Sequence, residues 1–291
     1  MITREVLHKV RRIEITTRRF VDELVAGAYH SVFKGQGIEV EEVREYVPGD
    51  DTRTIDWNVT ARLGYPYVKT FIEERELNVL LVVDVSASGD FGSNSQYKNE
   101  LAAEVAALLA FSAIRNNDRV GLLLFTTETE LFVPPRKGRR HVLRLIRELL
   151  AHERRSEGTD VNGALETVFR MLHRKAVVFL ISDFIDEGFE HGVRIAGKKH
   201  DLIALRVLDR REMEVPSAGW LAVEGAERGG VTFFNSGKAR IRDEYVSAAA
   251  ELRSEQESVF RSAGVDLIDL YCGEDYVEPL MGLFRRRRGR R

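Results

Sequence analysis

Hydrophobic and polar residues follow one pattern in the first quarter of the chain and another in the rest. Over residues 2–32, apolar positions recur at helical spacing, which predicts two amphipathic helices or one helix with a break. Residues 38–46 alternate apolar and acidic side chains, as a half-exposed strand does. A short helix around Trp57 and a strand over 65–72 are expected to follow. Residues 1–76 are therefore predicted to form an N-terminal α+β appendage.

From Leu77 onward, segments with strand character alternate with segments of helical periodicity. The clearest strand is the unbroken apolar run Val79–Val83, whose β-branched residues are typical of a strand buried on both faces. Further strands are expected over 120–125, 130–133, 176–181, 201–207 and 265–270. Helices are expected over 98–115, 139–150, 161–172, 190–197 and 238–263. Pro134 and Pro135 are expected to break the chain after the strand that begins at residue 130.

Repeated strand–helix units predict an α/β fold, with a doubly wound, mostly parallel sheet of Rossmann type covered by helices on both faces. This domain is expected to span residues 77–284. Residues 210–235 interrupt the alternation with short, glycine-separated strand patterns, which predict a β-rich insertion that packs on the appendage. The last segment, 285–291, contains six arginines and is expected to be a solvated basic tail.

Composition narrows the class of protein. A hydrophobic share of 44% and a charged share of 31% are typical of a soluble globular chain. The formal net charge of −2 gives no global preference for nucleic acid or membranes. A single cysteine, Cys272, excludes an internal disulfide and agrees with a reducing compartment. The charged N-terminus lacks the apolar core of a signal peptide, and no apolar run is long enough to span a membrane. We therefore expect a cytoplasmic protein.

Acidic and hydroxyl side chains follow two of the predicted strands. Asp84 ends the first strand and is followed at alternate positions by Ser86 and Ser88, while Asp183 ends a later strand and Thr159 precedes a helix. Ligands of doubly wound sheets bind at the carboxyl edge where the strand order reverses, so these five oxygen donors are expected to meet there. Hard oxygen donors suit Mg²⁺, with Mn²⁺ or Ca²⁺ as substitutes. Two carboxylates would leave the ion able to bind an Asp or Glu of another protein.

The same residues carry a resemblance. Asp84-x-Ser86-x-Ser88, Thr159 in a Gly-Thr-Asp triplet and Asp183 in an Ile-Ser-Asp triplet resemble the metal-ion-dependent adhesion site of von Willebrand factor A domains. The chain as a whole is similar to the bacterial and archaeal domain-of-unknown-function family 58, through REYVPGDDTRTIDWNVTAR, VLLVVDVSASGDFGS, FTTETELFVPPRKG and LISDFID. The A-domain motif would cover about residues 77–270, and the family resemblance extends into the appendage.

The resemblance implies a von Willebrand factor A-like fold, a metal held by the five residues, and work beside MoxR-type AAA+ ATPases in chaperone-like complexes. Each residue alone also has a structural explanation, since acids and serines begin turns and Thr159 could cap the helix at Val161. A metal-dependent hydrolase or phosphatase is one alternative, although position 86 is Ser where an aspartyl nucleophile needs a second carboxylate. Nucleic-acid binding through the arginine tail is another, although no aromatic residues interleave the arginines. We therefore expect a non-enzymatic module for protein–protein interaction.

Overall fold

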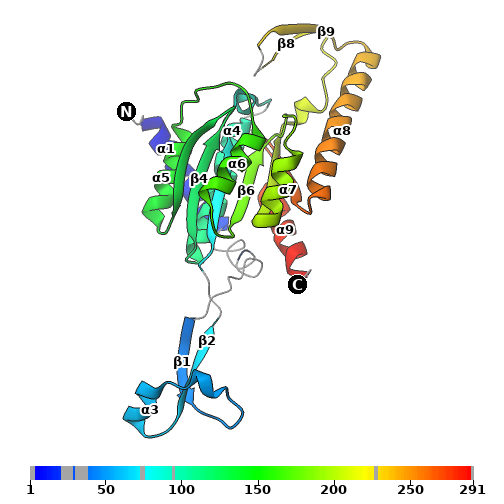
Figure 1. Ribbon diagram of the computed structural model, residues 1–291. Helices are drawn as coiled ribbons and strands as arrows, with labels where there is room; N and C mark the ends of the chain where they lie inside the picture. The colour runs from blue at the N-terminus through cyan, green and yellow to red at the C-terminus, as the bar shows by residue number, and fades with distance from the viewer. Residues whose placement is uncertain are drawn as a thin grey trace.

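A six-stranded sheet forms the centre of this computed structural model (Figure 1). The structure describes residues 4–20, 29, 39–72, 76–93, 96–225 and 229–289. In chain order, the strands of the sheet are β3 (Asn78–Asp84), β4 (Arg119–Phe125), β5 (Thr129–Arg136), β6 (Val177–Ser182), β7 (Asp201–Leu208) and β10 (Asp266–Tyr271). They lie in the order β10-β7-β6-β3-β4-β5, and every neighbouring pair is parallel except β4 with β5. The predicted α/β fold with a doubly wound, mostly parallel sheet is confirmed.

The order of the strands reverses beside β3. The chain runs outward from β3 through β4 to β5 and then crosses back to β6, which pairs with the other side of β3. In doubly wound sheets, ligands bind outside the carboxyl ends of the strands at such a reversal. Asp84 is the last residue of β3, and Asp183 directly follows β6. Both carboxylates therefore begin at this point of the sheet.

Helices cover both faces of the sheet. One face packs against α1 (Arg4–Phe20), α4 (Lys98–Arg115), α5 (Arg139–Leu150) and α9 (Val277–Gly289), and the other against α6 (Val161–Met171), α7 (Glu190–Lys199) and α8 (Ala239–Ser262). Val79, Leu81 and Val83 enter the first core, whereas Leu80 and Val82 enter the second. Burial on both faces explains why no polar residue interrupts this strand. In the part of the chain that the structure describes, no helix has both the length and the apolar character needed to cross a membrane.

The first helix packs on the main domain. It lies against α4 and α5, and its Ile13 and Thr17 are buried. The predicted second helix before residue 32 falls largely outside the described residues. Within it the structure describes Tyr29, whose ring packs edge-on against Phe284 of α9 at 6.1 Å between centroids. The domain boundary at residue 76 stays a prediction.

The remainder of the predicted appendage forms a small hairpin unit. Strands β1 (Glu39–Glu45) and β2 (Tyr67–Ile72) pair antiparallel, with η2 (Thr52–Thr54) and α3 (Trp57–Leu63) between them in the chain. Asp56 caps α3 by accepting hydrogen bonds from the N–H groups of Asn58 and Val59. In Figure 1 this unit stands apart from the central sheet.

The insertion over 210–235 has the predicted β structure but lies in a different place. Its 3₁₀ turn η4 (Arg210–Glu212) leads to a hairpin of β8 (Trp220–Glu224) and β9 (Val231–Asn235). Phe234 stacks on Tyr245 of α8 with 6.5 Å between ring centroids, and Arg242 donates to the carbonyl of Ser236. The hairpin and the β1–β2 unit lie at opposite ends of the molecule in Figure 1. The expectation that the insertion packs on the appendage is therefore wrong.

The prolines at positions 134 and 135 do not end their strand. Strand β5 runs through both of them to Arg136. It is the outermost strand on its side of the described sheet, and an edge strand tolerates proline because the missing N–H group can face away from the neighbouring strand. The expected break after residue 133 is therefore wrong.

The basic C-terminal segment belongs to helix α9. Leu280, Leu283 and Phe284 are fully buried against the sheet. Arg287 donates hydrogen bonds to Asp201 at 2.7 Å and to Asp266 at 2.6 Å. The predicted basic tail is therefore helical through Gly289. Arg285, Arg286 and Arg288 are exposed, as expected of a solvated segment, whereas Arg287 is partly buried against two strands.

Candidate functional site

The loop after β3 gathers three of the predicted oxygen donors. The Oδ1 atom of Asp84 accepts a hydrogen bond from the N–H of Ser86 at 2.9 Å. The chain then curls into a 3₁₀ turn, η3 (Ala87–Asp90), which brings the hydroxyl oxygens of Ser86 and Ser88 to 3.1 Å from one another. Alternate positions in this loop therefore direct their side chains to one place, as the spacing predicts.

The end of β6 supplies a hydroxyl and a carboxylate. The Oγ atom of Ser182 donates to Oδ2 of Asp84 at 2.6 Å and accepts from the N–H of Phe184 at 2.9 Å. Ser182 thus joins the carboxyl ends of two adjacent strands. The sequence pattern gave it no separate role, although it lies directly before the predicted Asp183.

The backbone after Asp183 turns through Phe184, whose φ of 58° lies in the left-handed region that large residues rarely adopt. The ring of Phe184 is buried against Phe189 and Phe260. Its carbonyl accepts a hydrogen bond of 2.7 Å from Nε2 of Gln256 on α8. These contacts stabilise an unfavourable turn, and such turns concentrate at functional sites.

A lysine that the sequence analysis did not single out lies in the middle of the site. Lys98, the first residue of α4, has only 3% of its side chain exposed. Its ammonium contacts Oδ2 of Asp183 at 2.7 Å and Oε1 of Glu212 at 2.6 Å. The sequence signal for this role was the position of Lys98 at the start of a predicted helix. A cation in the first turn of a helix interacts unfavourably with the helix dipole, so it needs an anionic partner.

Burial and the neighbouring carboxylate of Asp183 raise the pKa of Asp84 to about 7, against hydrogen bonds from Ser182 and Ser86 that lower it. Burial lowers the pKa of Lys98, but the carboxylates of Asp183 and Glu212 outweigh this and raise it above its usual value. Near neutral pH the site therefore contains a titrating carboxylate beside a charged ammonium.

Four of the five predicted donors line one small cavity together with Lys98. These four residues are Asp84, Ser86, Ser88 and Asp183. The cavity volume of about 20 Å³ is enough for one water molecule or one ion. Two carboxylates and two hydroxyls suit a hard cation, but the ammonium of Lys98 already supplies a positive charge to one carboxylate. Among the described residues, no group of three or more His, Cys, Asp or Glu could hold a metal. In this structure the positive charge beside Asp183 is that of Lys98.

Thr159 lies at the same edge of the sheet but outside the residues that line the cavity. The carbonyl of Glu157 accepts a hydrogen bond from the N–H of Ala87, and the N–H of Asp160 donates to the carbonyl of Thr126. These bonds hold the segment around Thr159 against the loops after β3 and β4. The alternative role of Thr159 as the cap of α6 is wrong, since the Asp160 side chain accepts from Gly163 in that position.

The insertion is attached directly to the site. Asp209, which follows β7, is fully buried and accepts hydrogen bonds from the N–H and hydroxyl of Ser93. Its own N–H donates to Oε2 of Glu212, whose other oxygen contacts Lys98. The turn that opens the insertion is therefore held by the same buried charges that surround Asp183.

The strand order, the helices on both faces and the Asp-x-Ser-x-Ser loop at the reversal point define a von Willebrand factor A-like α/β protein. The chain belongs to the family described as "Protein of unknown function DUF58", whose model matches residues 42–255. Both predictions from the resemblance, the family and the fold, are confirmed.

Relatives and solved structures match this chain over different extents. The chain is 33% identical over 282 residues to an uncharacterized protein of Mycobacterium tuberculosis, covering 96% of this chain and 89% of that protein. It is 25% identical over 167 residues to the uncharacterized protein YeaD of Bacillus subtilis, covering 57% of this chain and 40% of that protein. Among solved structures, the conserved hypothetical protein BatB of Bacteroides thetaiotaomicron is similar at a TM-score of 0.49 and 13% identity, over 74% of this chain and 100% of that one. The VWA domain of SpRpn10 is similar at a TM-score of 0.41 and 8% identity, over 72% of this chain and 95% of that one.

Proposed function

We propose that this protein is a non-enzymatic binding module that captures a carboxylate of a partner protein at the carboxyl ends of β3 and β6. The observation that carries the proposal is the shared cavity of Asp84, Ser86, Ser88 and Asp183 at the reversal of strand order. Ligands of doubly wound sheets bind at this point. The von Willebrand factor A-like arrangement of the strands supports the same conclusion.

In this proposal the cavity holds Mg²⁺, with Mn²⁺ or Ca²⁺ as substitutes, through Asp84, Ser86, Ser88 and Asp183. Thr159, the fifth predicted donor, lies outside the cavity lining and would have to approach to reach the ion. When bound, the ion supplies an electrophilic position for an Asp or Glu of the partner. The residues of the chain have two tasks. The carboxyl group of Asp84 loses its proton. The ammonium of Lys98 leaves Asp183 and keeps only its contact with Glu212, which lies 2.6 Å away.

The proposed partner is a MoxR-type AAA+ ATPase, acting with this protein in the cytoplasm in a chaperone-like complex. The resemblance to family 58 supports this choice of partner. The alternative of a hydrolase has less support, because Ser86 stands where an aspartyl nucleophile needs a second carboxylate.

Calorimetric titration with Mg²⁺ and Mn²⁺ tests the metal. We expect binding by the wild type, no binding by Asp84→Ala/Asp183→Ala, and unchanged binding by Asp243→Ala, which removes an exposed carboxylate of α8. Equal heats from the wild type and the double variant would contradict the proposed ligands. No heat from the wild type would contradict the resident metal and leave Lys98 as the cation of the site.

A second experiment tests the partner. Binding of a MoxR-type ATPase is measured with the same variants, with Mg²⁺ and with a chelator. We expect the complex to be lost in the double variant and with the chelator. Normal binding by the double variant would contradict the proposed docking point.

A further inference from the structure

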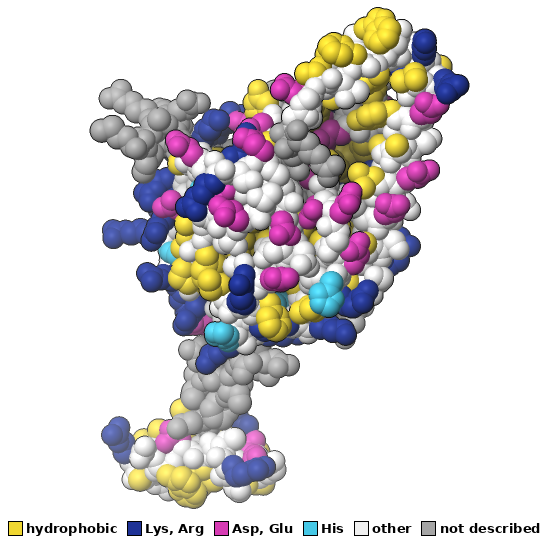
Figure 2. Space-filling model, turned by 45° about the horizontal axis from the view of Figure 1, so that its top comes forward, with side chains coloured by type: hydrophobic (Ala, Val, Ile, Leu, Met, Phe, Trp, Pro, Cys, Tyr) yellow, Lys and Arg dark blue, Asp and Glu magenta, His cyan; other side chains and the backbone are white. Residues whose placement is uncertain are grey.

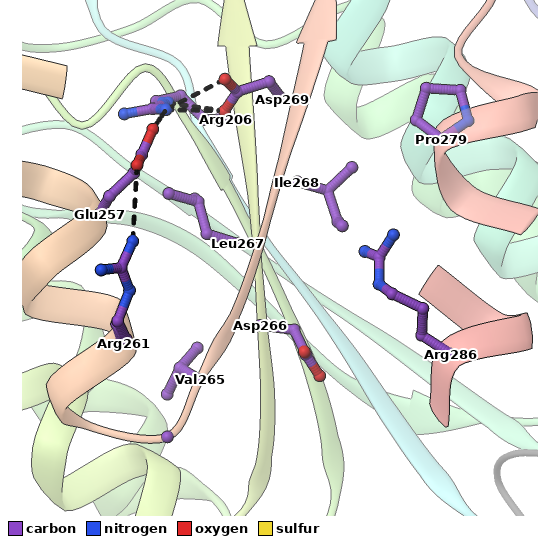
Figure 3. A pocket seen from close by; sticks show the side chains of 11 residues that line it. Arg206, Glu257, Arg261, Val265, Asp266, Leu267, Ile268, Asp269, Pro279 and Arg286 are labelled. Atoms are coloured by element: carbon purple, nitrogen blue, oxygen red, sulfur yellow. Dashed lines mark hydrogen bonds and ion pairs between the residues drawn. The ribbon is translucent and has the colours of Figure 1, made fainter. Parts of the chain in front are cut away.

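A groove with a volume of about 670 Å³ follows the outer edge of β10. Figure 3 shows its construction. The strand forms the floor, α8 contributes Glu257 and Arg261 on one side, and α9 contributes Pro279 and Arg286 on the other. The groove therefore runs along a strand between two helical walls.

The floor of the groove is an open sheet edge. Within the described residues β10 pairs with β7 alone, so half of its backbone N–H and C=O groups point away from any strand. Leu267 lines the groove and is partly buried, whereas Val265 and Ile268 are 7% and 6% exposed and belong to the two hydrophobic cores. Such an edge binds an extended segment, which adds as a further strand through main-chain hydrogen bonds.

The carboxylates that line the groove already have arginine partners. Asp269 accepts from Nε of Arg206 at 2.8 Å and from Arg253 at 2.8 Å. Asp266 accepts from Arg287 at 2.6 Å. The third, Glu257, lies 3.4 Å from the fully buried guanidinium of Arg206. The negative charges of the groove are therefore balanced from within the protein.

Two arginines on opposite walls are open to a ligand. The side chain of Arg261 is 81% exposed, and its contact with Glu257 is a loose 3.8 Å. Arg286 is exposed and has no ion pair with any other residue that the structure describes. Figure 3 shows these two guanidinium groups on the two sides of β10. The charge that remains available in the groove is positive on both walls.

We propose that the edge of β10 between α8 and α9 binds an extended acidic segment of a partner protein. The segment adds to the sheet beside β10 through its backbone. Its apolar side chains contact Leu267, and its carboxylates contact Arg261 and Arg286. This surface is separate from the proposed metal site and does not depend on it.

The test measures binding of a fluorescent peptide that alternates glutamate and valine over about eight residues, the length of an ordinary strand. Fluorescence anisotropy is expected to show saturable binding to the wild type. Arg261→Glu/Arg286→Glu is expected to weaken binding about tenfold or more, because both exposed cations become anions. The matched control, Arg144→Glu/Arg240→Glu, reverses two exposed arginines elsewhere and is expected to leave the affinity within about twofold.

Two further peptides separate strand addition from simple charge attraction. Methylation of alternate backbone nitrogens is expected to weaken binding about tenfold, because the peptide loses donors needed for main-chain pairing. A lysine–valine peptide is expected not to bind. Absence of binding by the glutamate–valine peptide, equal binding by its methylated form, or equal losses in both reversal variants would each overturn the proposal. A dimer of the protein that only the groove variant abolishes would also overturn it, since the occupant would then be a second copy.

Discussion

Charge is arranged in opposite ways at the carboxyl-edge site and in the groove beside β10. In the site, the ammonium of Lys98 is buried and already contacts Asp183 and Glu212. In the groove, the lining carboxylates are paired, while Arg261 and Arg286 lie open to solvent. A cation that enters the site must therefore displace an internal ion pair, whereas an anion that enters the groove meets exposed charges directly. On the face that Figure 2 shows, both basic and acidic side chains are exposed.

Helix α8 contacts both regions. Arg206, in the wall of the groove, donates to Oε1 of Gln256 at 2.7 Å. The Nε2 atom of Gln256 donates to the carbonyl of Phe184, in the turn that follows Asp183. Contact of this kind makes the two regions neighbours without showing that they are coupled. Each variant below is therefore checked for folding before its effect on binding is compared.

The largest effect is expected from Lys98→Met, which keeps the length of the side chain but removes its charge. Asp183 is then buried without its partner, and loss of one partner from a buried pair costs about 3 to 5 kcal/mol. We expect the free energy of unfolding, measured with urea, to fall by this amount. Mg²⁺ is expected to restore part of the loss, because a bound ion would replace the ammonium.

The matched control is Lys137→Met, which removes a partly exposed lysine paired with Glu76 on the surface. An exposed pair contributes less than about 1 kcal/mol, so this variant is expected to unfold almost as the wild type does. Equal losses in the two variants would show that burial of Lys98 does not matter. Failure of Mg²⁺ to stabilise Lys98→Met would show that the cavity does not accept an ion in place of the ammonium.

A smaller effect is expected from pH. The pKa of Asp84 is raised to about 7 by burial and by Asp183, so its carboxyl group holds a proton below that pH. A proton and a cation compete for the same oxygens, so Mg²⁺ affinity is expected to rise with pH. Between pH 6 and pH 8 the rise is about tenfold, as a single group with this pKa requires. Calorimetry at both values checks it, and equal affinities would exclude Asp84 as a ligand.

The parts of the site that could be predicted from the sequence are close together in the chain. Burial on both faces leaves a signal in five consecutive residues of β3, and one turn then gathers Asp84, Ser86 and Ser88. The role of Lys98 could not be predicted in this way. Its contact with Glu212 joins residues 114 positions apart, and each residue alone is typical of a solvated surface.

Contacts between distant parts of the chain also explain why two predicted element ends, those of β5 and α9, differ from the structure. Strand β5 continues through two prolines because it has a neighbour on one side only, which is a property of the whole sheet. Helix α9 has only a few apolar positions before its arginines, and Arg287 is held by carboxylates from two separate strands. Position in the assembled sheet decided both outcomes, and no local pattern carries that information.

The smallest expected effect compares two adjacent arginines of α9, one paired with carboxylates and one exposed without an ion pair among the described residues. Arg287 is 14% exposed and contacts both Asp201 and Asp266, so Arg287→Ala is expected to lower the free energy of unfolding by about 1 to 3 kcal/mol. Arg286→Ala removes an exposed cation that lines the groove and is expected to change stability by less than about 0.5 kcal/mol. Urea unfolding of the two variants side by side measures the difference. If Arg286→Ala were the more destabilising, the cation would have a structural partner within the protein and would not be available to an acidic segment in the groove.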